Sequence, residues 1–178
     1  MAVILPTNDK FLTAILNSKL VWYFLTNICV VRSGGYIEVK PQYFEQIPIP
    51  IINNSADLDE KTNSIIEFTS KIQKVVNGFT KYLQSQFAIE NLPKKLQNWH
   101  ELEFSEFINE LNKAIKKVGG EKLTKTDEMD WMDVFETKKA EAQTLKTEID
   151  KTDKEIDQMV YALYGLSEEE IKIVEGSN

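Results

Sequence analysis

The chain has 178 residues, of which 42% are hydrophobic and 28% are charged, and its net charge is −7 at neutral pH. A chain of this size can bury a core as one soluble domain, or as one domain with a helical appendage. The negative charge argues against binding nucleic acid by bulk electrostatic attraction alone. The charge is uneven, because residues 1–50 hold four basic and three acidic side chains, whereas the remainder holds 17 basic and 25 acidic ones.

The single cysteine, Cys29, excludes a disulfide within the chain and favours a reducing, cytoplasmic location. It lies in the apolar run Ile28–Val31, which predicts a small buried side chain. The most apolar stretch, Leu20–Val31, contains Thr26 and Asn27 and is too short to cross a bilayer. The N-terminus also lacks the pattern of a secretory signal. We therefore expect no membrane partner.

Residues 9–27 are predicted to form one helix that is apolar on nearly every face, which is typical of a buried helix. Only a small segment follows it that could cover this surface, and Val3-Ile4-Leu5 resembles a strand without neighbours. We therefore expect natural sequence upstream of Met1. The alternative is a homodimer formed through the exposed apolar helix 9–27.

Residues 33–50 are predicted to form a rigid platform of short extended pieces, over residues 36–39 and 43–47. At its start, the pair Gly34-Gly35 permits positive φ and close approach of another backbone. At its end, Pro48 and Pro50 fix φ and disfavour helix in the residues before them. The platform should connect two helices.

Two long helices are predicted over residues 57–90 and 126–164, because apolar residues recur there every seven positions, as in coiled coils. Between them, residues 91–125 contain two shorter helices that should cap the far end of the pair. Gly165 should end the second long helix, and Ser167 should cap a final short one. The seams are Ile65, Ile72 and Phe79; Phe68, Val75 and Tyr82; Phe135, Ala142, Ile149, Ile156 and Leu163; and Leu145, Thr152 and Met159.

The predicted fold class is therefore mainly α with a small α/β part, in which a long antiparallel helical hairpin accompanies a short-stranded platform. The predicted domains are residues 1–55 and the helical hairpin 56–178.

No catalytic or metal site is predicted. His100, the only histidine, has no second ligand at metal-binding spacing and no nucleophile elbow to serve, so we interpret it as a helix-surface residue. Asp9 with Glu38 and Lys40 superficially fits a nuclease pattern, but a chain with 28 acidic side chains produces such matches by chance. No glycine-rich phosphate or dinucleotide motif is present in the sequence.

The start of the platform is a candidate DNA-binding surface. Arginine can read guanine or clamp a phosphate, and glycine N–H groups and hydroxyls suit phosphate oxygens. The alternative is a hairpin turn whose polar side chains merely face water. The candidate residues are Arg32, Ser33, Gly34, Gly35, Tyr36, Lys40 and Gln42.

A lysine cluster around Gly119-Gly120 is a second candidate, because it could contact DNA phosphates without reading sequence. The alternative is an ordinary solvated charged face. The principal candidates are Lys113, Lys116 and Lys117, with Lys122 and Lys125 beside them.

Three segments, in this order, resemble the C-terminal specificity domain of TaqI-like adenine-specific DNA methyltransferases, a family that includes bifunctional type II restriction–modification enzymes. These segments are residues 15–20, 34–50 and 155–171, and the resemblance covers nearly the whole chain. The Ile-Pro-Ile-Pro step at 47–50 is also similar to the specificity subunits of type I systems.

The resemblance implies a target-recognition domain that positions the enzyme on double-stranded DNA, while a separate catalytic domain transfers a methyl group from S-adenosylmethionine to adenine. The chain lacks the Asn-Pro-Pro-Tyr-type motif, the cofactor-binding glycine motif and a cleavage domain. We therefore expect a non-catalytic fragment without a cofactor, whose partners are DNA and the rest of the parent enzyme. The alternative is a helical protein–protein assembly module whose DNA contact is incidental.

Overall fold

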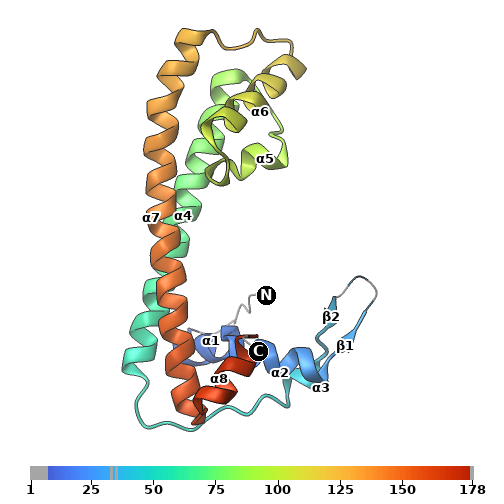
Figure 1. The fold of residues 1–178 in the computed structure, drawn as a ribbon, viewed down its shortest axis with the longest axis vertical. Helices are drawn as coiled ribbons and strands as arrows, with labels where there is room; N and C mark the ends of the chain where they lie inside the picture. The colour runs from blue at the N-terminus through green and yellow to red at the C-terminus, as the bar shows by residue number, and fades with distance from the viewer. Residues whose placement is uncertain (1–7, 33, 35, 177–178) are drawn as a thin grey trace. The chain divides into compact units, whose positions relative to one another are not determined.

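The computed structural model describes residues 8–32, 34 and 36–176, and it confirms that the chain is mainly α-helical (Figure 1). The chain divides into two compact units. Unit 1 comprises the described residues of Met1–Ile66 and Asp150–Asn178, and unit 2 comprises Glu67–Ile149. Val3-Ile4-Leu5, which we interpreted as a strand without neighbours, lies outside the described residues.

The two long helices are confirmed as α4 (Ala56–Phe87) and α7 (Lys125–Tyr164). Each contributes to both units, so the units do not coincide with the predicted domains 1–55 and 56–178. Within each unit the α4 and α7 segments pack side by side. Lys61 pairs with Glu155 in unit 1, and the Trp131 ring lies 5.6 Å from that of Phe87 in unit 2.

The apolar segment at residues 9–27 forms two helices rather than the single one predicted: α1 (Lys10–Asn17) and α2 (Lys19–Ile28). The break occurs at Ser18, whose hydroxyl donates to the Ile15 carbonyl at 2.7 Å and accepts from the Val21 N–H at 3.3 Å. Ser18 thus ends α1 and caps α2, as serine does where its side chain competes with the helix ladder.

The expectation that little in the chain covers this segment is wrong. Ile15 and Leu25 are completely buried, in a cluster that also contains Leu58 from α4 and Val160 from α7. The start of α4 and the end of α7 therefore supply the missing cover. The aromatic exceptions on α2 are Trp22 and Tyr23, which are 41% and 36% exposed.

The platform contains strands β1 (Val30–Val31) and β2 (Ile37–Glu38), paired antiparallel with Val30 opposite Glu38. The second predicted extended piece is wrong, because helix α3 (Pro41–Phe44) occupies its start. Pro41 stands in the first turn of α3, where its fixed φ and missing N–H favour a helix start. The Tyr164 hydroxyl donates to the Pro48 carbonyl and ties the end of the platform to α7.

Unit 2 is built around the chain between the long helices, which forms α5 (Lys94–Gln97), a 3-10 turn at Trp99–Glu101 and α6 (Phe104–Lys117). Its core is aromatic: the Trp99 ring lies 4.3 Å from that of Phe79, and Phe107 stacks on Phe135 at 4.6 Å. The insertion therefore packs against the two long helices through an aromatic core to which all three segments contribute.

The chain ends as predicted. Gly165 follows α7 with φ of 68°, and Leu166 N–H bonds back to the Tyr161 carbonyl at 3.1 Å. Ser167 and Glu170 then form a capping box that begins α8 (Glu168–Val174). Among the described residues, no helix has the length and apolarity needed to span a membrane.

Ala88 follows α4 with φ of 50°, a conformation that disfavours residues with a Cβ atom. We expect Ala88→Gly to raise the free energy of unfolding by about 0.5–1 kcal/mol, after the entropy gained by the unfolded chain is deducted. Gly165→Ala is the matched opposite change, because Gly165 has φ of 68° and its added Cβ would meet no atom within 4 Å. It should destabilise by about 1 kcal/mol. Urea denaturation of both variants measures the change in the free energy of unfolding. Changes of the same sign in the two variants would contradict the left-handed backbone conformation at Ala88 and Gly165.

Candidate nucleic-acid interface

The β1–β2 hairpin presents one face to solvent and one to the core of unit 1. Ile37 and Val39 pack against the buried cluster around Ile15 and Leu25. Because side chains alternate along a strand, positions 30, 32, 36, 38 and 40 share the opposite face. We call the side chains of Arg32, Tyr36, Glu38 and Lys40 the hairpin face. Figure 1 shows the hairpin extending beyond α2 and α3 within unit 1.

An ion-pair network organises the hairpin face. The Arg32 Nε donates to Glu38 Oε2 at 2.9 Å, and Arg32 Nη2 donates to the same oxygen. The Lys40 Nζ lies 3.7 Å from that oxygen. The hydrogen bond from Arg32 lowers the pKa of Glu38 below its usual range, so this carboxylate stays ionised. Two cations surround one anion, which leaves the hairpin face with one excess positive charge.

Tyr36 lies at the end of the hairpin and is 76% exposed, although its backbone is fixed by a 2.7 Å hydrogen bond from Arg32 N–H to its carbonyl. Gly34 has φ of 89°, and an added Cβ there would approach the Tyr36 ring to 3.3 Å. The positive φ therefore favours glycine at this turn, whereas the exposed Tyr36 ring could shift to admit a Cβ. Ser33 and Gly35, the other two candidates in the turn, lie outside the described residues.

Gln42 is exposed on α3, two residues after Lys40, which is the N-cap residue of this helix. Its backbone carbonyl accepts from Gln46 Nε2 at 2.7 Å, which holds the end of α3. The structure therefore places Arg32, Tyr36 and Lys40 together on the hairpin face and Gln42 on the adjoining helix.

The candidate lysines belong to unit 2, whereas the hairpin face belongs to unit 1. Lys116 and Lys117 are exposed in the last turn of α6, where positive charge stabilises the helix end. The Lys113 Nζ lies 2.8 Å from Glu110 Oε1, and Lys125 Nζ lies 2.8 Å from Glu128 Oε2. These neighbouring carboxylates weaken the positive field expected from the lysine cluster.

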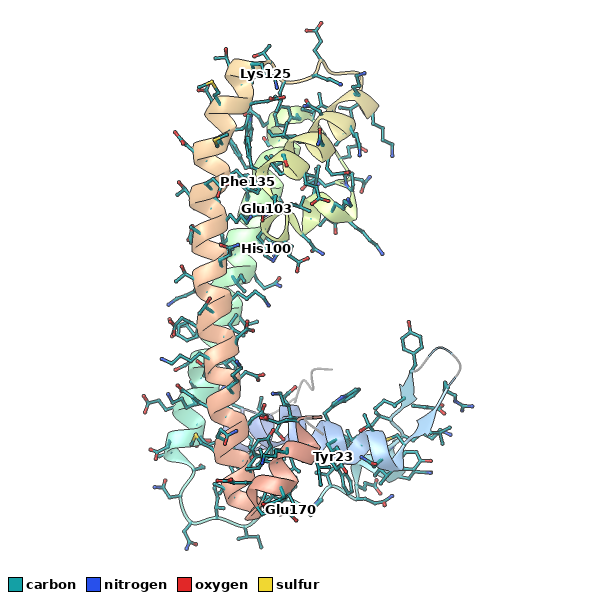
Figure 2. All side chains as sticks on the ribbon, viewed as in Figure 1. Tyr23, His100, Glu103, Lys125, Phe135 and Glu170 are labelled. Carbon is teal, nitrogen blue, oxygen red and sulfur yellow. The ribbon has the colours of Figure 1, made fainter. Side chains whose placement is uncertain are left out.

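His100, which is labelled in Figure 2, lies in the 3-10 turn of unit 2. It is partly buried rather than on an open helix surface, and its burial lowers its pKa. Its ring centroid lies 5.7 Å from that of Trp99. The part of the chain that the structure describes contains no group of three potential metal ligands.

A cavity of about 640 Å³ lies in unit 2, between the end of α4 and the end of α6. Ile89, Leu92 and Ala114 form its apolar wall, and Glu90 and Lys117 are its charged members. The lining includes no histidine, serine or cysteine that could act as base or nucleophile. The cavity does not gather a catalytic set.

The most buried carboxyl group among the described residues escaped the sequence analysis. Asp157 on α7 is 2% exposed, and its Oδ1 accepts from the Lys19 N–H at 2.8 Å, at the start of α2. The Lys19 Nζ lies 3.7 Å from Asp157 Oδ2 and 4.0 Å from Glu175 Oε1. Burial raises the pKa of Asp157 and also that of Tyr161 one turn later. The sequence offered no sign of this, because Asp157 lies among many acidic residues of one helix.

The structure defines the class of protein: the chain is mainly α, it carries a solvent-facing β-hairpin, and a helical insertion separates its two long helices. Residues 51–160 match the family described as Domain of unknown function (DUF8810), and the chain belongs to that family. No curated protein and no solved structure matches the chain. The matched segment begins after the hairpin, so the hairpin face lies outside it.

Proposed function

We propose that the chain is a non-catalytic target-recognition and spacer module of a restriction–modification adenine-N6 DNA methyltransferase, and that it positions the enzyme on double-stranded DNA. The observation that carries the proposal is the hairpin face, on which Arg32 and Lys40 pair with Glu38 and the exposed Tyr36 lies on the same side by strand register. A two-stranded β-ribbon fits the major groove of B-DNA. S-adenosylmethionine would be bound by the catalytic domain of the parent enzyme, and no step here depends on it.

The resemblance to the specificity domains supports the same role, because it includes the hairpin segment and the end of α7. The long helices α4 and α7 would act as the spacer that connects the hairpin to the rest of the enzyme. Few cations are available, so binding by the chain alone should be weak and sensitive to salt.

The test is fluorescence anisotropy with labelled duplex DNA at low salt. We expect Arg32→Ala with Lys40→Ala to weaken binding at least about tenfold and to reduce the slope of log K against log salt by about 0.9 for each phosphate that is no longer neutralised. Lys74→Ala with Lys81→Ala is the matched control, because it removes two exposed cations that belong to neither candidate surface. Equal losses in the two double variants would contradict the proposal.

The alternative is a protein–protein assembly module. The exposed aromatic side chains of α2, Trp22 and Tyr23, favour it, because aromatic groups are enriched at interfaces. Tyr23 is labelled on α2 in Figure 2. Tight self-association in sedimentation experiments, with no DNA binding at low salt, would support this alternative and reject the DNA role. Trp22→Ala with Tyr23→Ala should then abolish the association.

A further inference from the structure

Glu38 is the acidic member of the hairpin face, and its position is unusual for a surface that binds a polyanion. It would repel phosphates, and it neutralises part of the positive charge of Arg32 and Lys40. A surface that only attracted the DNA backbone would be improved by its removal. The Glu38 carboxylate therefore has a role other than attracting the DNA backbone.

The hydrogen bonds of Arg32 suggest that role. A guanidinium has five N–H donors in a fixed plane. Glu38 Oε2 accepts one from Nε and one from Nη2, so it occupies one edge of the group. Among the residues that the structure describes, Glu38 is the only acceptor for this guanidinium, so both Nη1 donors and the second Nη2 donor remain. The outer Nη1–Nη2 edge presents two parallel N–H groups. This edge matches the O6 and N7 acceptors of guanine in the major groove.

The rest of the hairpin face fits this arrangement. Arg32 stands opposite Tyr36 on the paired strand, and its backbone N–H donates to the Tyr36 carbonyl. Its Cα is therefore fixed by the hairpin, while its side chain is fixed by Glu38. A long side chain held in one conformation before binding loses less entropy when it docks. Lys40, 3.7 Å from the same carboxylate, offsets the charge of Glu38 and stays available to a phosphate.

We infer that Glu38 is a positioning residue that fixes the guanidinium of Arg32 to read a guanine in the major groove of duplex DNA. The inference rests on the proposed function and adds the base and the group that sets specificity. A surface ion pair that merely stabilised the hairpin would produce no preference for a base.

The experiment uses the full chain. Duplexes are first selected from a randomised pool, and binding is then compared between the selected duplex and copies in which single guanines are replaced by 7-deazaguanine, which lacks the N7 acceptor. We expect one such replacement to weaken binding about tenfold. Arg32→Lys should lose this sensitivity, because an ammonium cannot donate two parallel N–H groups in the geometry of a guanidinium.

Glu38→Gln should also lose the 7-deazaguanine sensitivity, while its overall affinity for unselected duplex stays the same or rises. Glu45→Gln is the matched control, since it makes the same charge change at an exposed position on α3's end and should keep the sensitivity. Amide hydrogen exchange at Arg32, whose N–H donates to the Tyr36 carbonyl across the hairpin, reports whether each variant retains the hairpin. An RNA duplex of the selected sequence should compete poorly, because side chains cannot enter its narrow major groove.

Sensitivity that persists in a folded Glu38→Gln would overturn the inference, as would selected duplexes without a guanine requirement or equal competition by RNA. In each of these outcomes the chain still binds nucleic acid, so the positioning role of Glu38 fails separately from the wider proposal. If the unmodified chain binds no duplex at low salt, the proposed function itself fails.

Discussion

Trp99→Ala should lower the free energy of unfolding of unit 2 by about 3–5 kcal/mol, the range found when large aromatic side chains are removed from cores. Trp99 is completely buried and contacts aromatic rings from both long helices, with Phe79 at 4.3 Å and Phe135 at 6.0 Å. Its indole N–H also donates to the Val76 carbonyl at 3.3 Å. Alanine would remove both the ring packing and this link between the insertion and α4.

Hydrogen exchange of amides in α6 and in the unit 2 part of α7 measures the destabilisation. Trp22→Ala is the matched control, because it removes the same side chain from a position that is 41% exposed in unit 1. That change should cost less than about 1 kcal/mol. Protection of unit 2 that is unchanged in Trp99→Ala would mean that the aromatic cluster does not hold the insertion to the long helices.

The second large effect is expected at Asp157, where Asp157→Ala should destabilise unit 1 by about 1–3 kcal/mol. The substitution leaves the partly buried Lys19 N–H at the start of α2 without its acceptor, and an unmade hydrogen bond of this kind costs about 1–3 kcal/mol. Asp157→Asn retains an acceptor oxygen and removes the charge. It should be at least as stable as the unmodified chain at neutral pH.

The dependence on pH distinguishes these variants. Burial raises the pKa of Asp157 above its ordinary value of about 3.9. The hydrogen bond from the Lys19 N–H lowers this pKa, but by less than burial raises it, and the negative charges of Asp153 and Glu175 raise it further. The stabilising contribution of the protonated form is therefore complete below about pH 3.9 and is lost as pH rises through the folded-state pKa. Tyr161, one turn further along α7, also interacts electrostatically with this carboxyl, and its raised pKa keeps it neutral across this range.

Urea denaturation between about pH 4 and pH 8 checks this sign. The difference in unfolding free energy between Asp157→Asn and the unmodified chain should move in favour of the variant as pH rises. A difference that moves the other way would show that Lys19 and the start of α2 stabilise the carboxylate by more than its burial costs.

The sequence by itself determined the long helices. Apolar residues at every seventh position, together with Gly165 after the last turn, predicted both bounds of α7 within one residue. Such signals are local, because a helix is specified by its own caps and periodicity. For the same reason the short final helix and its cap at Ser167 were predictable.

The sequence also pointed to Arg32, Tyr36 and Lys40 as exposed polar or aromatic residues around a glycine turn, and the strand register places all three on one face. It did not reveal Glu38 as the common partner of Arg32 and Lys40. In the sequence, Glu38 was considered only as part of a chance nuclease pattern. The pairing depends on which residues lie across the hairpin, and register is a property of two strands rather than one.

The tertiary structure alone decided what covers the first helices and where the buried charge lies. Ile15 and Leu25 are buried because α7 returns to them from more than a hundred residues along the chain, and the same return places Asp157 against the start of α2. The local pattern of apolar residues indicates that one surface of a helix is buried, but it does not indicate which distant segment covers that surface. Burial and the pKa of a buried group arise from contacts between segments, so they appear only when the chain is folded.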